Sequence, residues 1–147
     1  MMLDDCPFCR ILNGELETEL VYRDETVAAF FHISPVNPGH MLVIPVEHHG
    51  SVTSIPENVQ GHMLNLAGKL GSYLTRILDM DGYNLHMASG DCAGQAFRHA
   101  HIHVIPRGPT EGFAWSWRCI DDSDVDYAEL TGKLRRKLGA QPDERQD

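Results

Sequence analysis

The pattern of apolar and polar positions predicts several short strands and one long helix. Short apolar runs bounded by turn residues are typical of strands. Such runs occur at 20–22, 27–31, 41–44, 83–88 and 99–105. Apolar residues then recur at helical spacing from Ile55 to Asp79, and Ser54 and Glu57 have the spacing of a capping box. The expected buried face of this helix is Val59, Met63, Leu66, Ala67, Leu70, Leu74, Ile77 and Leu78. Strands in succession around one helix favour an α+β fold with an antiparallel sheet of about five strands.

Two shorter helices are expected to flank this sheet. The first covers Pro7–Asn13, with Gly14 as its stop signal, and the last covers Val125–Leu138 with its apolar residues on one face. A chain of 147 residues fits one domain of ordinary size. We therefore expect a single domain at 1–138 and a frayed tail at 139–147.

Composition narrows the class of protein. Hydrophobic residues make up 42% of the chain, and 21 acidic against 12 basic residues give a net charge of −9. That charge argues against binding to nucleic acid and to an anionic membrane surface. No apolar run reaches the roughly 18 residues of a membrane span, and Met1–Arg10 does not resemble a secretory signal. The expected protein is soluble and cytoplasmic, with cysteines that are reduced thiols or metal ligands.

Three alternating histidines, His99, His101 and His103, dominate the candidate chemistry. On a strand this spacing places the three imidazoles on one face and the intervening apolar residues on the other. The apolar alternation indicates that the opposite face is buried. Because imidazole titrates near neutral pH, three of them on such a strand favour a functional role. Imidazole can bind a metal, transfer a proton or attack an electrophile such as phosphorus.

The loop before this strand favours phosphorus chemistry. Gly90 and Gly94 allow positive φ and close backbone approach, so that N–H groups can converge on an anion. Gln95 adds neutral donors. The loop and the strand together favour a phosphoryl group bound over the central histidine.

These motifs resemble the histidine triad (HIT) family of nucleotide hydrolases and transferases. His99–Ile105 matches the family's His-x-His-x-His motif, Ala93–Gln95 stands at its glycine–glutamine element, and Ile33–Pro45 is similar to its second hallmark. The resemblance covers residues 6 to 113. It implies a HIT-like fold, a homodimer, and cleavage at the α-phosphate of nucleoside phosphoramidates or dinucleoside polyphosphates.

The resemblance also implies a role for each histidine of the motif. His101 would attack the α-phosphorus and form a nucleotidyl-histidine intermediate that water then hydrolyses. His103 and the backbone amides near Gly94 and Gln95 would hold the phosphate oxygens. His40 would orient the triad by hydrogen bonding, and the alternative for His40 is a buried histidine of the core.

The nucleotide site departs from the family pattern at three positions. The resemblance places His32 and Ile33 at this site, and His32 stands where the family has a ribose-binding acidic residue. Ala88 and Ala96 stand where relatives often have asparagine and a hydroxyl residue. A neutral imidazole offers one acceptor and one donor, whereas a carboxylate accepts from both ribose hydroxyls. These changes keep His101 but reduce the number of polar side chains expected around it.

Cys6 and Cys9 form a C-x-x-C pair that fits a redox pair, a chance spacing or half of a structural zinc site. His48 and His99 are the candidates for the other two ligands, and similarity to bacterial HIT proteins supports this set. His49 is adjacent to His48 and is the alternative ligand. Four protein ligands leave no open position on the metal, so the implied Zn²⁺ is structural.

Three functional hypotheses remain open at this stage. The first is a HIT hydrolase or transferase with a nucleotide substrate, and the second is a nucleotide-binding or signalling module with weak or lost catalysis. The third is a metallohydrolase in which all three triad histidines bind a catalytic metal. Phe113, Trp115 and Trp117 also alternate, which fits a wall over a base, a subunit interface or ordinary packing.

Overall fold

The protein was analysed as a computed structural model that describes residues 5–109 and 119–139. The chain divides into two compact units, Met1–Phe113 and Ala114–Asp147, and each is described by itself. The sheet and two helices, α1 and α2, lie in the first unit, and one helix, α3, lies in the second. Phe113, Trp115 and Trp117 lie outside the described residues.

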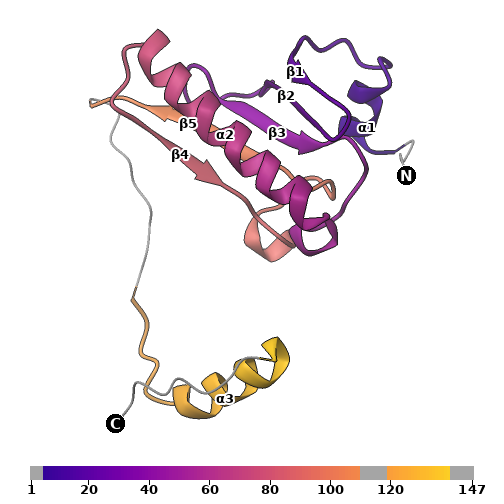
Figure 1. Cartoon of the computed structure of the whole chain (residues 1–147). Helices are drawn as coiled ribbons and strands as arrows, with labels where there is room; N and C mark the ends of the chain where they lie inside the picture. The colour runs from indigo at the N-terminus through magenta and orange to yellow at the C-terminus, as the bar shows by residue number, and fades with distance from the viewer. Residues whose placement is uncertain (1–4, 110–118, 140–147) are drawn as a thin grey trace. The chain divides into compact units, whose positions relative to one another are not determined.

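The first unit is built on a five-stranded antiparallel sheet with strand order β1-β2-β3-β5-β4 (Figure 1). The strands are β1 (Leu20–Arg23), β2 (Val27–Phe31), β3 (Met41–Pro45), β4 (Gly82–His86) and β5 (Ile102–Arg107). The helices are α1 (Pro7–Leu12) and α2 (Glu57–Ile77), with short 3-10 turns η1 (Val52–Ser54) and η2 (Asp91–Ala93). The α+β fold with five antiparallel strands is confirmed.

Asp24 closes the β1–β2 hairpin and connects it to α2. Its Oδ1 accepts the N–H groups of Thr26 and Val27, both at 2.8 Å, and its Oδ2 lies 2.6 Å from His62 Nε2. Burial alone would raise the pKa of Asp24, but the hydrogen bonds from His62, Thr26, Val27 and Tyr22 outweigh it and hold the pKa below its ordinary value. The predicted polar turn is therefore also a contact between sheet and helix.

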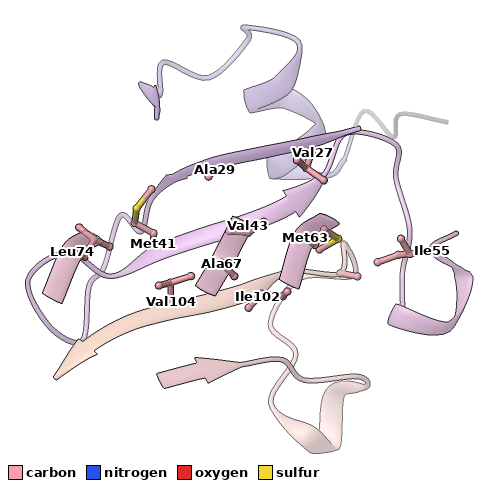
Figure 2. Packing of buried hydrophobic residues seen from close by; sticks show 11 residues of the cluster. Val27, Ala29, Met41, Val43, Ile55, Met63, Ala67, Leu74, Ile102 and Val104 are labelled. Atoms are coloured by element: carbon pink, nitrogen blue, oxygen red, sulfur yellow. The ribbon is translucent and has the colours of Figure 1, made fainter. Parts of the chain in front are cut away.

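One face of the sheet packs on α2 and forms the larger core (Figure 2). Alternate residues of β2, β3 and β5 point to this side, because successive side chains of a strand point to opposite faces. The buried cluster comprises Val27, Ala29, Met41, Val43, Ile55, Met63, Ala67, Leu74, Ala100, Ile102 and Val104. The prediction that the residues between the histidines face a buried core is confirmed.

The opposite face of the sheet packs on α1. This cluster comprises Cys6, Phe8, Cys9, Leu12, Ala28, Phe30, Leu42 and Ile44. Because β2 and β3 contribute residues to both clusters, these two strands are buried on both faces. The N-terminal segment thus covers the face on which His101 and His103 lie.

The structure corrects the predicted start of the long helix. Pro56 occupies the N-cap position without a side-chain cap, and Ser54 Oγ donates instead to Ser51 O at 2.9 Å. The Gln60 side chain supports this segment, because its Nε2 donates to Ile55 O at 2.7 Å. The predicted capping box of Ser54 and Glu57 is therefore wrong, although Glu57 does lie in the first turn.

The structure also shifts the ends of several elements. The long helix ends at Ile77 instead of Asp79, and the Ile77 side chain is 76% exposed, outside the buried face to which it was assigned. The histidine strand begins at Ile102 and continues to Arg107, past Pro106. His99 and His101 therefore precede the strand, although their side chains keep the predicted side.

In the second unit, α3 (Tyr127–Leu138) begins at Asp126, whose Oδ1 accepts the N–H of Glu129 at 2.9 Å. It ends at Gly139, which has a φ of 63°. The helix confirms the element predicted at Val125–Leu138 to within two residues. A single domain at 1–138 and a frayed tail at 139–147 stay predictions.

Gly71 of α2 provides a test of how the helix packs on β4. A Cβ at this position would lie 2.4 Å from the Tyr83 ring. We expect Gly71→Ala to lower the free energy of unfolding by about 1–3 kcal/mol, because the ring or the helix must shift. Urea denaturation followed by circular dichroism measures the change.

Gly61 is the matched control on the same helix. Nothing lies within 4 Å of a Cβ at Gly61, which is exposed. Gly61→Ala is expected to stabilise the protein by about 0.5–1 kcal/mol, as alanine does in an open helix position. Equal stabilisation by both substitutions would contradict the packing of α2 on Tyr83.

Candidate active site and metal cluster

A pocket of about 370 Å³ lies on the α1 side of the sheet, in front of the histidine segment. Its lining includes three histidines, His32, His101 and His103, and two small residues, Gly94 and Ala96. Its apolar walls include Phe8, Phe30, Phe31, Ile33, Leu42 and Phe97. The structure therefore brings His32, Ile33, Gly94, His101 and His103, which were predicted to act together, to one concave surface.

His101 has a fixed tautomer. Its Nδ1 lies 2.7 Å from the carbonyl oxygen of His99, and a carbonyl can only accept. Nδ1 therefore carries the proton and Nε2 has a free lone pair. Burial lowers the pKa of His101, and the bond to the His99 carbonyl partly offsets this. The ring is thus held neutral with Nε2 as its nucleophilic atom.

His40 fixes the tautomer of His103 in the same way. The Val36 N–H donates to His40 Nδ1 at 3.1 Å, so Nε2 of the neutral His40 ring carries the proton. That Nε2–H donates to His103 Nδ1 at 2.9 Å, which leaves a proton on His103 Nε2. Burial, with a contribution from His32, lowers the pKa of His40 to about 4. His40 thus contacts His103 rather than His101, and His103 keeps an N–H donor.

His32 is also held with its donor nitrogen free. The Ser34 N–H donates to His32 Nδ1 at 2.9 Å, so Nε2 carries the proton. The ring stacks on His40 with centroids 4.4 Å apart and an interplanar angle of 21°. Nitrogens of His32, His40 and His103 lie within 4.8 Å of one another, a spacing that could hold a metal. Ligation through Nε2 of His32 or His40 would, however, require an imidazolate, so the hydrogen bonds disfavour a metal here.

The loop at 89–95 adopts the predicted positive φ angles, 95° at Gly90 and 90° at Gly94. The N–H of Gly94 donates to Asp91 O at 3.0 Å and that of Gln95 to Gly90 O at 3.2 Å, so both close the turn. The Gln95 side chain is buried, accepts the Gly90 N–H and donates to Gly50 O, each at 2.9 Å. In this structure Gln95 braces the loop and does not line the pocket.

The free backbone donors lie one step further along the chain. Within the described residues, the N–H groups of Ala96 and Phe97 have no hydrogen-bond partner, and both residues line the pocket. The absence of a hydroxyl at Ala96 drew attention to its side chain, but its backbone also carries an N–H without a partner at this pocket. No signal in residue type identifies a free N–H, because every residue except proline carries one.

Cys6, Cys9, His48 and His99 form a second cluster, with ligand atoms within 4.8 Å of one another. Cys6 Sγ lies 3.4 Å and Cys9 Sγ 3.7 Å from His99 Nδ1, and Cys9 Sγ lies 3.3 Å from His48 Nδ1. Zinc bonds of about 2.3 Å to sulfur and 2.0 Å to nitrogen give tetrahedral S···N edges of about 3.5 Å. The cluster therefore has the dimensions of a four-ligand metal site.

The tautomer of His99 supports the same conclusion. Its Nε2 lies 2.8 Å from Pro45 O and must donate to it, so Nδ1 presents a lone pair to the two sulfur atoms. A metal ion satisfies a lone pair in that position, and the carbonyl then orients the ligand ring. His49 lies outside the cluster, with Nε2 3.8 Å from Glu47 Oε2, so the geometry favours His48 over His49.

Phe8, between the two cysteines, was not singled out from the sequence. Its ring lies 5.6 Å from the ring of His99 and 5.3 Å from that of His101, near perpendicular to both. The cluster and the pocket therefore share one wall. A C-x-x-C pair indicates its sulfur atoms but says nothing about the side chain between them.

Comparisons with known proteins agree with this site. The HIT domain family matches residues 13–110. A HIT-like protein of Borreliella burgdorferi is 41% identical over 113 residues, which are 76% of this chain and 81% of that protein. An adenosine 5′-monophosphoramidase of Candida albicans is 30% identical over 142 residues, 90% of this chain and 88% of that protein. A crystal structure of a HIT family protein from Bacillus anthracis matches with a TM-score of 0.80 at 30% identity, over 95% of this chain and 99% of that chain.

The chain therefore belongs to the HIT family, which confirms the resemblance drawn from the histidine motif. Among the described residues, no helix has the length and apolar character needed to cross a lipid bilayer.

The neutral histidines make stability depend on pH. Burial, followed by the neighbouring histidines, lowers the pKa of His103 to about 3, below the ordinary value of 6.5 that it regains on unfolding. Between these values the unfolded chain binds more protons, so the free energy of unfolding should fall as the pH falls from about 6.5. Each such proton contributes a slope of up to about 1.4 kcal/mol per pH unit.

His103→Asn isolates this contribution, because its side-chain oxygen can still accept from His40 while it cannot titrate. We expect a shallower loss of stability between about pH 6.5 and 4.5 in this variant, measured by urea denaturation across the range. Equal slopes in the two proteins would show that His103 is not held neutral by folding.

Proposed function

We propose that this protein is a nucleotide hydrolase or transferase that cleaves at the α-phosphate of nucleoside phosphoramidates or dinucleoside polyphosphates. The observation that carries the proposal is the lone pair on His101 Nε2 at the polar end of an apolar pocket. Family membership supports it, and so does the similarity to an adenosine 5′-monophosphoramidase.

The reaction proceeds in two displacements on phosphorus. The lone pair of His101 Nε2 bonds to the α-phosphorus, and the bond to the leaving group breaks with its electron pair, which water protonates. The ring becomes cationic while Nδ1 keeps its proton, so the bond to the His99 carbonyl strengthens. A second water then attacks phosphorus, displaces Nε2 and releases a proton, which returns His101 to its starting state.

Three donors are placed to hold the phosphoryl oxygens. These are His103 Nε2–H and the N–H groups of Ala96 and Phe97, all at the pocket. Fixed donors stabilise charge that builds in a transition state without reorganising. In this proposal Gly94 forms the turn before Ala96. The Gln95 side chain stabilises that turn through its hydrogen bond to Gly50 O. His40 acts as a positioning residue through His103.

The apolar walls suit the nucleoside part of the substrate. Phe31, Ile33 and Phe97 line the pocket and are 52%, 97% and 42% exposed. Planar bases pack favourably on aromatic faces. We assign the walls to a nucleobase and the imidazoles to the phosphate. We also keep a homodimer in the proposal, because β4 is an edge strand that a second copy can extend.

Cys6, Cys9, His48 and His99 would hold a structural Zn²⁺. Bound there, zinc supplies a cross-link between the N-terminal segment and the segment before β5, and with four protein ligands it has no position for substrate. Two hydrogen bonds within the chain also hold the segment before β5. The Ala100 N–H donates to His49 O at 2.6 Å, and the His99 side chain donates to Pro45 O. The metal site thus supports the loop that carries the nucleophile.

His101→Ala tests the assigned nucleophile. We expect cleavage of adenosine 5′-monophosphoramidate to fall at least about 10³-fold in kcat, because no other bare imidazole nitrogen is assigned to this pocket. Release of adenosine monophosphate, followed by chromatography, measures the rate. His62→Gln on α2 is the control and should keep full activity.

Normal turnover by His101→Ala would contradict the covalent mechanism. Wild-type protein that binds adenosine monophosphate in a calorimeter yet cleaves no member of a phosphoramidate and dinucleoside polyphosphate panel would instead be a binding module.

His48→Ala and His49→Ala test the metal site as a matched pair. We expect about one zinc per chain in wild type and in His49→Ala, and loss of most zinc with a lowered Tm in His48→Ala. Elemental analysis and thermal unfolding with and without a chelator measure both effects. Loss of zinc in His49→Ala alone would reverse the ligand assignment.

A further inference from the structure

His32 lies in the same pocket as the assigned nucleophile but takes no part in the displacement described above. The ring centroids of His101 and His103 are 4.8 Å apart, and those of His103 and His32 are 5.8 Å apart. Among the imidazoles that line the pocket, His32 is thus the next one beyond His103. The sugar is the part of a nucleotide bonded directly to the phosphate, so His32 is placed to meet the sugar.

The hydrogen bond from Ser34 decides what His32 can recognise. A backbone N–H can only donate, and it occupies Nδ1 at 2.9 Å. Turning the ring over would put a C–H against this N–H and leave it unpaired. Protonating Nδ1 would set two N–H groups against each other. His32, which lines the pocket, therefore carries its proton on Nε2 and offers a donor and no acceptor.

We propose that His32 selects nucleotides whose sugar carries a second anionic group, with a phosphate at the 2′ or 3′ position as the expected class. An oxygen of that group accepts the His32 Nε2–H. An unmodified ribose hydroxyl can accept the same N–H only as a neutral group, which makes a weaker hydrogen bond. It also finds no acceptor on His32, because Nδ1 is already bonded to the Ser34 N–H. This inference rests on the proposed nucleotidyl transfer and names the substrate class for the same site.

The other groups around the pocket favour the same class. His103 Nε2–H and the N–H groups of Ala96 and Phe97 are donors too. Among the described residues that line the pocket, Glu17 is the only carboxylate, and it is exposed. The polar end of the site is therefore rich in donors and poor in acceptors, as binding of an oxyanion requires.

The test compares three substrates in wild type: adenosine 5′-phosphoramidate, its 2′,3′-dideoxy form and its 3′-phosphorylated form. We expect the 3′-phosphorylated substrate to have the highest kcat/KM, by at least about tenfold. A hydrogen bond to a charged acceptor stabilises the bound substrate by a free energy that corresponds to a factor of about ten. Loss of the two hydroxyls should cost less than about threefold.

His32→Gln and His32→Glu are matched variants of similar size. Glutamine keeps a donor and should keep the preference for the 3′-phosphate, whereas glutamate offers only acceptors and should reverse it in favour of the hydroxyls. His62 does not line the pocket, so His62→Gln should leave the ranking of the three substrates unchanged. A wild-type preference for the unmodified ribose, or the same ranking in the glutamine and glutamate variants, would overturn the inference.

A binding measurement separates this inference from the proposed function. Calorimetry compares adenosine 3′,5′-bisphosphate with adenosine 5′-monophosphate on wild type and on His32→Glu, and it needs no turnover. Tighter binding of the bisphosphate in wild type alone supports the role of His32 even if no substrate is cleaved. Equal or weaker binding of the bisphosphate in wild type refutes it even if phosphoramidates are cleaved.

Discussion

The site depends on three hydrogen-bonding positions of one residue, His99. Its Nδ1 faces the sulfur atoms of Cys6 and Cys9, its Nε2 is bonded to the Pro45 carbonyl, and its own carbonyl orients His101. Each contact requires the others, because the bond to Pro45 leaves the lone pair on Nδ1, and the position of the ring fixes the backbone that points at His101. The lone pair that could bind a metal and the orientation of His101 are therefore two consequences of the same geometry.

Backbone groups set the tautomers of the pocket histidines. His32 and His40 accept N–H groups from Ser34 and Val36, and His101 donates to a carbonyl. Backbone donors and acceptors cannot exchange roles, whereas two neighbouring imidazoles can. The loop between β2 and β3 thus determines that His32 and His103 donate, while the carbonyl of His99 determines that His101 Nε2 keeps a free lone pair. Burial keeps the pKa values of His40 and His103 low, so this assignment holds near neutral pH.

Features that depend on the order of side-chain types along the chain could be predicted from the sequence. Features that depend on backbone geometry could not. Alternation of histidine with apolar residues placed His101 and His103 on one face correctly, and the C-x-x-C spacing indicated the cluster with His48 and His99. The role of Gln95 was not predicted, because its partner Gly50 is distant in the chain. The capping box failed for a related reason. Ser54 has the right residue type and spacing, but the turn at Val52–Ser54 engages its hydroxyl and Pro56 takes the cap position.

The proposed phosphate binding by an acidic chain would have to rely on local dipoles. The net charge is −9, and among the described residues no lysine or arginine lines the pocket. Neutral N–H groups are sufficient only if they are held in place before the substrate arrives, because a dipole that must reorganise loses much of its contribution. The tight turn at Gly94, the brace from Gln95 to Gly50 and the bond from His40 to His103 each supply that rigidity. A metal bound by Cys6, Cys9, His48 and His99 would meet the same requirement, since it would fix the segment that leads to His101.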